Sequence, residues 1–458
     1  MAENREATFT SKIQQQVEML SRKAWYHSID LPDGTVIPGL IPVDALQGRL
    51  NAFPIPADLS GKRVLDVGAA TGWNSFALER RGAEVVAVDC VEYEEFLEAR
   101  ELLNSRVEYL VLDMEEMTPE ALGYFDYVVF FGVLYHLRHP LLGLERVCAL
   151  AREAAFVESF VTDATNGDIG AGGPCLLEFY ETKELGGQID NWFGPNVNCL
   201  MALCRSAGFA RVQFEYVSDR RAGVTCYRKW ASLPVDDTAP APWINSAVNN
   251  RTGDVSFRPP KDEYINLYFQ YPDRSLRMED VRVEVDGYGL PLLDLADLGR
   301  RGWQANLRVP PGLAPGAHEV RLRAGAGPSS NAFPIYIHTR ATPAEPQPEP
   351  RGEEQPAPEI FALENTRDGT CHFHGYKNEQ LCCCFRTAEP GLTKETMLLE
   401  IDGIEQPILL LTHTGPNEWQ TNSRLPKALP PGPHSARLRT RLSPFSREAG
   451  FHYEPDAS

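Results

Sequence analysis

The spacing of hydrophobic and polar residues changes near residue 240. Before it, continuous apolar runs alternate with stretches of helical period, which is typical of strands buried on both faces of a parallel sheet. After it, short segments of alternating period are broken by Asp-Gly and Pro-Gly turns, with no clear helix. The sequence therefore predicts a Rossmann-like α/β domain followed by an all-β region. The apolar runs expected to form parallel strands begin at Val64, Val85, Val107, Phe125 and Ala154.

The all-β region consists of two copies of one unit, because matching motifs return 116 residues later along the chain. For example, Trp303-Gln-x-Asn-x-Arg returns at Trp419, and Asp286-Gly returns at Asp402. Short alternating strands over about ninety residues predict an immunoglobulin-like β-sandwich for each copy. The predicted organisation is an α/β domain at 1–232, a sandwich at 243–340, an extended Pro/Glu-rich linker at 341–358 and a sandwich at 359–455.

A glycine-rich turn follows the first buried strand, in the segment Asp66-Val-Gly-Ala-Ala-Thr-Gly72. Glycine lets a backbone approach a ligand closely, and an acid at the tip of the next strand, here Asp89, can bind ribose hydroxyls. The turn has neither the spacing of a pyrophosphate-binding loop nor the Gly-Lys-Ser/Thr of a P-loop. It therefore favours a nucleoside ligand without a diphosphate, which we interpret as S-adenosylmethionine. The alternative is a structural turn in another doubly wound domain.

Ligands of parallel sheets bind at the carboxyl ends of the strands, so the residues there are candidates for cofactor contacts. We expect Asp113 and Met114 to flank the adenine, and Trp73 and Asn74 to contact the methionine moiety. The predicted cofactor-binding residues are Asp66, Gly68, Ala70, Gly72, Trp73, Asn74, Asp89, Asp113, Met114 and Gly132.

Residues 25–215 resemble the class I S-adenosylmethionine-dependent methyltransferases, within them the branch of the tRNA wobble-uridine oxyacetate-forming enzymes. One segment, Asn191-Trp-Phe-Gly-Pro-Asn196, is similar to relatives from glycan or secondary-metabolite neighbourhoods. The other segments that carry the resemblance are Trp25–Gly39, the turn at Asp66, Gly132–Leu141 and Ala207–Phe209.

The resemblance implies a methyltransferase, but it leaves the transferred group to be decided. The tRNA-modifying relatives use a carboxylated cofactor and place a lysine near the transferred group. Between Trp25 and Gly61 this chain offers Arg49 as its one Lys or Arg residue. We therefore expect transfer of a plain methyl group.

Methyl transfer to a hydroxyl needs a general base that removes the acceptor's proton, and the loop after the fourth strand offers candidates. His136 is the first choice, although it could instead orient the loop or cap a helix. Tyr135 and Glu158 complete the predicted catalytic set. The predicted substrate-binding residues are Tyr26, His27, Arg138, His139, Asn191, Trp192 and Asn196.

Two groups of residues resemble metal sites. His136 and His139 could share an ion with Glu158 or Asp163, but no third ligand has supporting spacing, and we predict no metal. In the second copy, Cys371, His372, His374 and the run Cys382-Cys-Cys384 resemble a zinc cluster. The repeat places these three cysteines on a strand, where successive side chains point to opposite faces, so we predict a strand. Trp303 and Trp419 could stack on sugars, but a core position is favoured.

Charge and composition narrow the expected partners. The chain has 63 acidic and 44 basic residues, a net charge of −19, and no dense basic run of the kind that binds nucleic acid. The segment that comes nearest to a basic run contains Arg220, Arg221, Arg228 and Lys229, and we interpret it as a solvated edge strand. Net charge alone does not exclude a local basic patch on the surface. No apolar run is long enough to cross a membrane.

The cysteine spacing and the start of the chain favour a cytoplasmic protein. The ten cysteines lack disulfide-framework spacing, and the first residues have no apolar signal core. The segment ending at Lys23 has Ile13, Val17 and Leu20 at helical spacing and predicts a short amphipathic helix. We expect this helix to close over the cofactor or to pack on the domain rather than to bind a membrane. The oligomeric state is not determined by the sequence.

The expected function is S-adenosylmethionine-dependent O-methylation of a sugar, a glycan or a specialised metabolite, with the sandwiches as glycan-binding or assembly modules. The first alternative is methylation of tRNA, at the wobble uridine, or of another RNA. The second is an interaction scaffold whose cofactor domain has decayed, against which the intact Asp66, Gly68, Gly72 and Asp89 speak.

Overall fold

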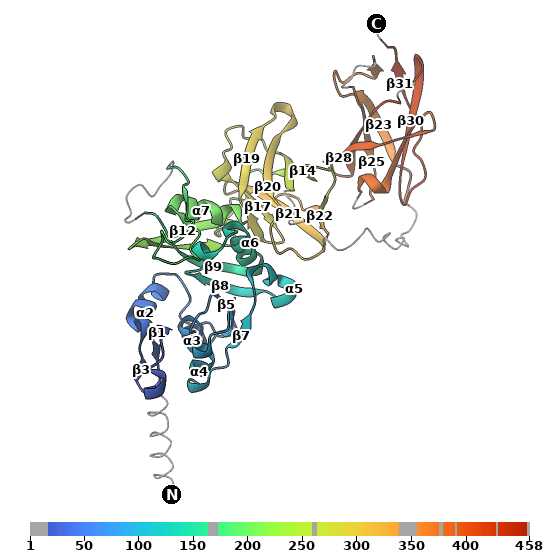
Figure 1. The fold of residues 1–458 in the computed structure, drawn as a ribbon. Coiled ribbons are helices and arrows are strands. Elements are labelled where there is room, and N and C mark those ends of the chain that lie inside the picture. The colour runs from blue at the N-terminus through green and yellow to red at the C-terminus, as the bar shows by residue number, and fades with distance from the viewer. Residues whose placement is uncertain are drawn as a thin grey trace. The chain divides into compact units, whose positions relative to one another are not determined.

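The computed structural model divides the chain into two units (Figure 1). The N-terminal unit holds Met1–Ala231 with Pro310–Gly312, and the C-terminal unit holds Ser232–Val309 with Leu313–Ser458. Ile13 of the predicted amphipathic helix and residues 341–354 of the predicted linker lie outside the described residues. The structure describes residues 17–163, 173–258, 263–338, 355–374, 379–389, 392–426 and 429–455.

A seven-stranded sheet in the order β12-β13-β9-β8-β5-β6-β7 forms the centre of the N-terminal unit. The strands β5 to β9 pair with one another in parallel. The strand β13 runs antiparallel to both of its neighbours, β9 and β12. This agrees with the predicted parallel sheet. The strands are β5 (Arg63–Val67), β6 (Glu84–Asp89), β7 (Glu108–Val111), β8 (Phe125–Phe131), β9 (Ala151–Phe160), β12 (Arg211–Ser218) and β13 (Arg221–Tyr227).

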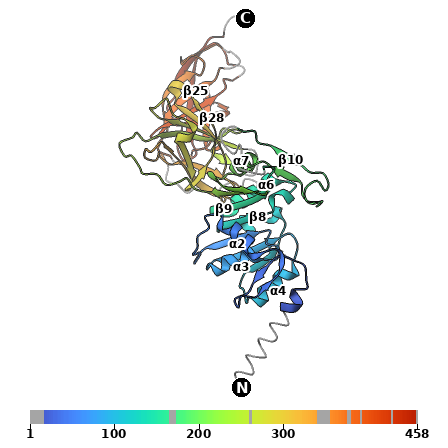
Figure 2. The same ribbon diagram turned by 90° about the vertical axis from the view of Figure 1, so that its left-hand side faces the viewer.

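Both faces of this sheet are covered by helices, because its strands are apolar on both sides. Leu65 and Val67 belong to one hydrophobic cluster, whereas Val64 just before them and the next strand's Val85 belong to the other. Figures 1 and 2 show α2, α3 and α4 on one side of the sheet and α6 and α7 on the other. None of the described helices is long and apolar enough to cross a membrane. The helices are α2 (Val43–Asn51), α3 (Trp73–Arg80), α4 (Glu94–Leu102), α5 (Pro119–Leu122), α6 (Pro140–Leu150) and α7 (Val197–Ser206).

The strand order reverses at β5, which determines where a ligand can enter. From β5 the chain continues to β6 and β7 on one side, and it then returns to β8 on the other side of β5. At such a switch point the loops that leave two neighbouring strands separate in opposite directions and open a crevice at their carboxyl ends. The turns after β5 and β8 therefore define the place to look for a site.

Two small pairs of strands precede the central sheet in the chain. β1 (Trp25–His27) pairs in parallel with β4 (Gly39–Ile41), and β2 (Ile29–Asp30) pairs antiparallel with β3 (Val36–Ile37). Trp25 is buried in the same hydrophobic cluster as α2 and α3, so this segment packs on the domain.

A further pair of strands, β10 (Leu177–Phe179) and β11 (Phe193–Pro195), forms an antiparallel ladder between β9 and α7. We call it the β10–β11 ladder. The backbone N–H of Trp192, just ahead of β11, donates to the carbonyl oxygen of Tyr135 at 2.8 Å. The ladder is thereby attached to the loop that follows β8.

The C-terminal unit contains two two-sheet sandwiches. In the first, the sheet β14-β16-β20-β19 faces the sheet β15-β22-β21-β17-β18, and one hydrophobic cluster contains residues of both sheets. The second repeats this order as β23-β25-β29-β28 and β24-β31-β30-β26-β27 around its own cluster. The first sandwich has β14 (Trp243–Asn249), β15 (Ser256–Phe257), β16 (Tyr264–Gln270), β17 (Val281–Val285), β18 (Tyr288–Leu290), β19 (Leu292–Asp297), β20 (Trp303–Arg308), β21 (Gly316–Ala324) and β22 (Phe333–Ile337). The second has β23 (Glu359–Asn365), β24 (His372–Phe373), β25 (Leu381–Arg386), β26 (Met397–Ile401), β27 (Ile404–Gln406), β28 (Ile408–Gly415), β29 (Glu418–Ser423), β30 (Gly432–Thr440) and β31 (Ala449–Tyr453).

The duplication seen in the sequence is confirmed strand by strand. The strand β14 and its counterpart β23 begin 116 residues apart, and so do β21 and β30. Trp303 and Trp419 occupy equivalent places in the two hydrophobic clusters, with exposed fractions of 4% and 9%. The core interpretation of these tryptophans is confirmed, and neither is placed to stack on a sugar.

Each sandwich fastens its Asp-Gly turn with a histidine. In the second sandwich Nδ1 of His434 lies 2.5 Å from Oδ2 of Asp402, and Nε2 lies 2.7 Å from the carbonyl oxygen of Pro430. His318 makes the same two contacts in the first sandwich, with Asp286 at 2.6 Å and with the carbonyl oxygen of Ala314 at 2.7 Å. Each histidine therefore connects its Asp-Gly turn to the segment just ahead of its own strand, β21 or β30.

The three adjacent cysteines lie on β25, as predicted. Cys383 is buried in the hydrophobic cluster, whereas Cys382 and Cys384 point to the opposite face, with their sulfur atoms 3.9 Å apart. Within the described part of the chain, no group of three or more His, Cys, Asp or Glu residues could hold a metal ion. The strand interpretation of this segment is confirmed.

Candidate active site

The glycine turn between β5 and α3 adopts a backbone that side chains would disturb. Gly68 has φ +74° and Gly72 has φ +93°, and Ala70 between them is also left-handed at +47°. A Cβ atom on Gly68 would lie 2.3 Å from Cγ2 of Val133, which belongs to the loop after β8. The missing side chain therefore lets the two loops of the switch point approach each other.

Asp89, at the end of β6, supports this turn. Its Oδ2 accepts a hydrogen bond from the backbone N–H of Ala70 at 2.9 Å, and its Oδ1 accepts one from Cys90 at 2.8 Å. The side chain is half-buried. The structure thus brings together the two features that the sequence singled out, the glycine turn and the acid at the neighbouring strand end.

Asp66 lies underneath the turn. Its carboxylate is 1% exposed and accepts a hydrogen bond from Oγ of Ser75, 2.6 Å away in α3. Burial raises the pKa of Asp66 to about 6, although the bond from Ser75 opposes the shift. In this geometry Asp66 connects β5 to α3 and supports the turn from below.

The two residues after the turn point in different directions. The indole N–H of Trp73 donates to Oδ1 of Asp30 at 2.7 Å, and the ring is buried in the cluster beneath the N-terminal strands. Our expectation of a methionine contact for Trp73 does not agree with this orientation. Asn74 is also buried, and its Oδ1 has no hydrogen-bond partner among the described residues, which leaves it available to a ligand.

The strand ends next to the turn carry the other cofactor candidates. Asp113 is exposed and caps the short helical turn η1 (Met114–Glu116), where its backbone N–H donates to Oε2 of Glu116 at 3.0 Å. Met114 is half-buried and packs against the margin of the core. Gly132 follows β8 with φ +73°. All three therefore lie at the carboxyl edge of the sheet, as expected.

The N-terminal strand β1 is joined to the glycine turn. The backbone N–H of His27 donates to Oγ1 of Thr71 at 2.9 Å, inside the turn itself. The imidazole is buried, and burial together with the charge of Arg49 lowers the pKa of His27 to about 3. Its Nδ1 has no partner in the described part of the chain. Tyr26, in contrast, is 43% exposed.

Tyr135, Arg221 and Glu158 form a polar cluster beside Gly132. The guanidinium of Arg221 binds both carboxylate oxygens of Glu158, at 2.5 and 2.6 Å, and donates from Nη1 to the hydroxyl oxygen of Tyr135 at 3.0 Å. A Cβ atom on Gly132 would lie 3.3 Å from Arg221 and 3.5 Å from the Tyr135 hydroxyl. Burial raises the pKa of Tyr135, partly offset by Arg221, so the phenol keeps its proton.

This cluster corrects two expectations. The side chain of Glu158 is 1% exposed and pairs with Arg221, so it does not reach toward an acceptor, and its direct catalytic role is not supported by the geometry. Arg221 was expected on a solvated edge strand with Arg220 and Arg228. Its strand β13 instead lies between β9 and β12, and Arg228 is buried at 2% exposure. Arg221 is therefore part of the site.

His136 lies next to this cluster on the short helical turn η2 (Leu134–His136). Its Nδ1 is 3.2 Å from the carbonyl oxygen of Asp190 and 3.5 Å from the Oδ2 of the same residue. The side chain is 33% exposed. An imidazole whose Nδ1–H donates to a fixed oxygen keeps the lone pair on Nε2, which is the arrangement that a general base needs.

The segment before α7 provides the remaining substrate candidates. Arg138 is exposed and its guanidinium lies 4.1 Å from the ring centre of Trp192, so these two side chains form one surface. Asn191 is buried, and its Nδ2 donates to the carbonyl oxygen of Leu185 at 2.8 Å. Asn196 does not form a pocket wall, because its Oδ1 caps α7 through a 2.8 Å bond from Cys199.

The alternative metal site is not assembled. His139 is exposed at the start of α6, whereas Glu158 is bound to Arg221. The carboxylate of Asp163 accepts a 2.6 Å hydrogen bond from the backbone N–H of Val197. Each carboxylate that was considered as a ligand already serves another partner.

Sequence reasoning missed Arg221, Asp190 and Thr71. The first two are brought to the site by contacts between distant segments, and nothing local in the sequence signals them. Thr71 lies inside the glycine turn, so its hydroxyl could have been named as a candidate contact from its position alone.

Comparison with known proteins agrees with this geometry. Residues 44–179 match the model of a family described as methyltransferase domain. The chain is 29% identical over 226 residues to the tRNA U34 carboxymethyltransferase of Syntrophotalea carbinolica, covering 44% of this chain and 62% of that protein. It is 41% identical over 92 residues to the magnesium-protoporphyrin O-methyltransferase of Rhodobacter capsulatus, covering 19% of this chain and 40% of that protein. The chain thus spans less than two thirds of these relatives.

Solved structures are similar over the same part of the chain. The crystal structure of the N-terminal domain of EvdMO1 with SAH bound is 20% identical, with a TM-score of 0.34, and the match covers 48% of this chain and 96% of that one. The matching family model and the sheet described above agree that the N-terminal unit contains a methyltransferase domain.

Proposed function

We propose that the N-terminal unit transfers a methyl group from S-adenosylmethionine to a hydroxyl of a sugar, a glycan or a specialised metabolite, with His136 as the general base. The observation that carries this proposal is the position of His136. It lies on the loop after β8, at the switch point of the sheet, and Asp190 fixes its Nδ1. A base oriented by a third group is the arrangement used to activate hydroxyl nucleophiles.

The residues of the crevice fit the cofactor. The glycine turn and Asp89 offer a close backbone and an acceptor for ribose hydroxyls, and two buried polar atoms, Oδ1 of Asn74 and Nδ1 of His27, have no partner among the described residues. Unpartnered buried polar atoms are rare unless a ligand or water satisfies them. When bound, S-adenosylmethionine supplies an electrophilic methyl group on a sulfonium. Gly68, Asn74, Asp89 and Gly132 would hold it.

Three residues on the side of the crevice that faces the acceptor can be given roles. His136 would accept the hydroxyl proton at Nε2, while Asp190 holds the proton on Nδ1. Tyr135 accepts a bond from Arg221 and can still donate its own hydroxyl proton to a polar group of the acceptor. Because Glu158 neutralises Arg221, this rim suits an uncharged acceptor better than an anionic one.

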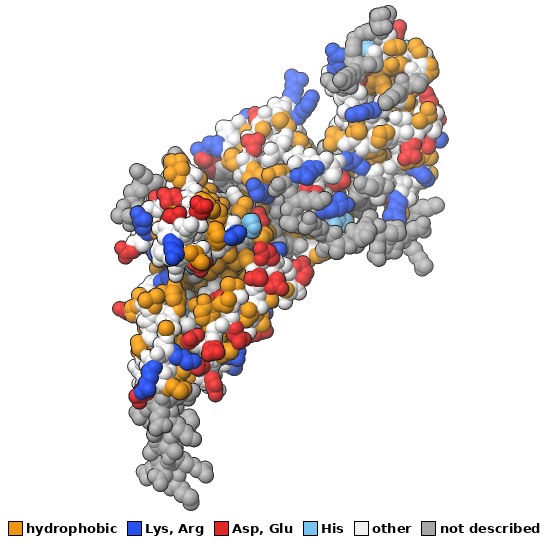
Figure 3. Space-filling view, in the orientation of Figure 1, with side chains coloured by type: hydrophobic (Ala, Val, Ile, Leu, Met, Phe, Trp, Pro, Cys, Tyr) orange, Lys and Arg blue, Asp and Glu red, His pale blue; other side chains and the backbone are white. Residues whose placement is uncertain are grey.

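The charge of the domain argues against RNA as the acceptor. Residues 1–242 contain 35 acidic and 21 basic residues, so the domain carries most of the net negative charge of the chain. Within the face of this unit seen in Figure 3, Lys and Arg side chains are scattered among Asp and Glu side chains. Proteins that bind a phosphate backbone present clustered Lys and Arg. The similarity to tRNA-modifying relatives keeps RNA as the second candidate.

We also propose that both sandwiches are immunoglobulin-like. Each places its first, third, seventh and sixth strands in one sheet and its second, ninth, eighth, fourth and fifth in the other, which corresponds to the ABED and GFC arrangement with an added strand at each edge. No disulfide joins the two sheets, since all ten cysteines are free. Free cysteines support a reducing, cytoplasmic location.

The proposal is tested by assaying the full chain with S-adenosylmethionine and a panel of sugars, glycosides and polyphenols, read by mass spectrometry as a gain of one CH₂. Replacing His136→Gln should lower kcat by about 10²–10⁴-fold. His372→Gln, which changes an exposed histidine of the second sandwich, is the matched control and should leave kcat unchanged. Equal rates for both variants would remove His136 from the mechanism.

The RNA candidate is tested separately by filter binding. Bulk tRNA at physiological salt should not be retained by the chain, because its methyltransferase domain is acidic. Tight retention that weakens steeply with salt would instead favour RNA as the acceptor. A chain that shows no thermal stabilisation by S-adenosylmethionine would favour the scaffold interpretation.

A further inference from the structure

The four-stranded sheet of the first sandwich has an outer face rich in tyrosines and amides. Along β16 the side chains of Ile265, Leu267 and Phe269 point into the hydrophobic cluster, and those between them point outward. The same alternation operates along β20. The outward residues are half-buried, and we call them the tyrosine–amide face: Tyr264, Asn266 and Tyr268 from β16, and Gln304, Asn306 and Arg308 from β20.

These six residues form three cross-strand pairs. Tyr264 stands opposite Arg308, and Asn266 stands opposite Asn306. Tyr268 stands opposite Gln304. Side chains that stand opposite each other on one face of an antiparallel pair are in contact range. Two tyrosine rings therefore lie on either side of Asn266 along β16, with Asn306 and Gln304 on the neighbouring strand.

The face has hydrogen-bonding capacity that the protein does not use. Nε2 of Gln304 donates to Oδ1 of Asn306 at 2.8 Å, so the Gln304 carbonyl and the Asn306 amino group are left for a ligand. Arg308 lies 5.8 Å from the ring centre of Tyr264, and its Nε has no partner among the described residues. The hydroxyl of Ser246, opposite Tyr268 on β14, is buried and likewise has none.

The second sandwich shows that the fold does not require this face. The positions of Asn266 and Tyr268 are occupied there by Cys382 and Cys384, which pair with Asn422 and Gln420 in the same register. Asp294, which stands opposite Asn306 in β19, is replaced by Leu410. Both copies keep the Gln, the Asn and the Arg of β20, but the first copy alone combines them with tyrosine rings.

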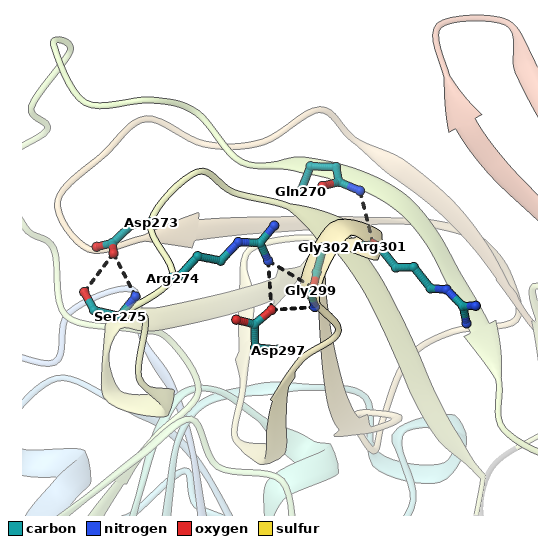
Figure 4. A network of polar contacts seen from close by, with 8 residues as sticks. All are labelled: Gln270, Asp273, Arg274, Ser275, Asp297, Gly299, Arg301 and Gly302. Atoms are coloured by element: carbon teal, nitrogen blue, oxygen red, sulfur yellow. Dashed lines mark hydrogen bonds and ion pairs between the residues drawn. The ribbon is translucent and has the colours of Figure 1, made fainter.

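The end of this sheet continues the polar surface (Figure 4). Gln270, the next outward residue of β16, donates from Nε2 to the carbonyl oxygen of Arg301 at 3.1 Å. Arg274 donates to Oδ1 of Asp297 at 2.8 Å. The second copy has Arg386, His413 and Asn417 in place of Gln270, Asp297 and Arg301, so this polar rim also belongs to the first copy.

The charge of the first sandwich selects among possible ligands. Residues 243–338 contain 11 acidic and 11 basic residues, and the face itself has a single arginine, Arg308, with Asp294 opposite Asn306 on the neighbouring strand. A polyanion or an anionic membrane needs several unpaired Lys or Arg residues. Tyrosine rings and amides instead suit the apolar faces and hydroxyls of sugar rings.

We propose that the tyrosine–amide face of the first sandwich binds a neutral carbohydrate chain, and that the second sandwich has lost this capacity. The tyrosine rings would stack on sugar rings, and Gln304, Asn306 and Arg308 would bind hydroxyl groups. The site lies on the sandwich and is independent of the methyl transfer proposed above.

The test applies the full chain, without cofactor, to an array of neutral and acidic oligosaccharides, followed by titration calorimetry with the best neutral ligand. Tyr268→Ala and Asn306→Ala should each weaken binding about tenfold or more, and Tyr268→Phe should retain most of it, since stacking needs the ring. Asn422→Ala in the second sandwich is the matched control for Asn306→Ala and should bind as the natural chain does. Thermal melting verifies that each variant is folded.

The proposal is overturned if no neutral oligosaccharide is retained above the level of the Tyr268→Ala variant, or if Asn422→Ala weakens binding as much as Asn306→Ala. Retention confined to acidic glycans, tRNA or anionic vesicles would also overturn it. Because the assay contains no S-adenosylmethionine, its outcome is separate from the success or failure of the methylation assay.

Discussion

Both carboxylate oxygens of Glu158 accept hydrogen bonds from Arg221, at 2.5 and 2.6 Å, and the same guanidinium holds the hydroxyl of Tyr135. A buried carboxylate with a bidentate arginine partner is satisfied as long as both members are present. Removing one member leaves the other buried and uncompensated. The pair therefore determines both the stability of the sheet and the position of Tyr135.

Arg221→Ala should lower the free energy of unfolding of the N-terminal unit by roughly 3 kcal/mol, because Glu158 stays buried without its partner. Adding Glu158→Leu to that variant should recover part of the loss, since the uncompensated charge is gone. Arg220→Ala, the exposed neighbour, should melt as the natural chain does. Calorimetric melting of these chains and of Glu158→Leu alone checks this, and additive effects of the two substitutions would contradict the pairing.

Gly68→Ala should weaken S-adenosylmethionine binding by about tenfold or more, because a Cβ at this position collides with Val133 and the backbone is left-handed. Gly61→Ala is a matched control, since Gly61 has the same φ of +74° with nothing within 4 Å of its missing Cβ. Combining Gly68→Ala with Val133→Ala should restore part of the affinity. Titration calorimetry measures all four, and equal affinities for the Gly68 and Gly61 variants would rule out the collision as the cause.

The raised pKa of Asp66 makes the stability of the N-terminal unit depend on pH. Below the ordinary aspartate range Asp66 is protonated in both the folded and the unfolded chain, and its burial has no charge penalty. As the pH rises toward the folded pKa of about 6, the unfolded chain loses its proton first, so the folded state loses stability. The loss amounts to about 3 kcal/mol at neutral pH.

Asp66→Asn should therefore be more stable than the natural chain at pH 7 and similar to it at pH 4, because the amide carries no charge to bury. Ser75 can donate to the amide oxygen as it does to the carboxylate. Melting temperatures of both chains measured from pH 4 to pH 8 check this. A difference that stays constant over that range would show that the substitution acts through packing.

Asp402 should produce the opposite dependence in the second sandwich. Burial alone would raise the pKa of Asp402, but hydrogen bonds from Ser435 and His434 outweigh it and hold the pKa below its usual value. The stabilisation is present above the ordinary aspartate range and is lost as the pH falls through the lowered pKa. Asp402→Asn should weaken this acid-side loss, which melting curves between pH 2 and pH 5 would detect. If the melting temperature of Asp402→Asn falls between pH 5 and pH 2 as steeply as that of the natural chain, Asp402 is not the group responsible.

The parts of the site that sequence analysis could predict are local. The glycine turn and Asp89 belong to one strand–helix–strand unit, so their order along the chain fixes their proximity. The duplication was visible because Trp303, Asp286 and their counterparts recur at one spacing. The same register placed Cys383 in a core strand correctly.

The parts that could not be predicted depend on contacts between distant segments. Arg221 and Glu158 are 63 residues apart, and they meet because β13 inserts between β9 and β12. Trp73 follows the glycine turn, yet Asp30 of the N-terminal strand turns its indole away. Asn196 was assigned to a pocket although its place before an apolar run is typical of a helix cap, a signal that could have been used.

The hydrogen bond from His27 to Thr71 has a practical consequence for studying this chain. A rearrangement of the turn that contains Thr71 would be transmitted to β1 through this one hydrogen bond. A fluorescent probe attached at Ala24, which is exposed beside that strand, could therefore report the arrival of a nucleoside without standing in its way. The entry of the ligand would become visible from outside the crevice.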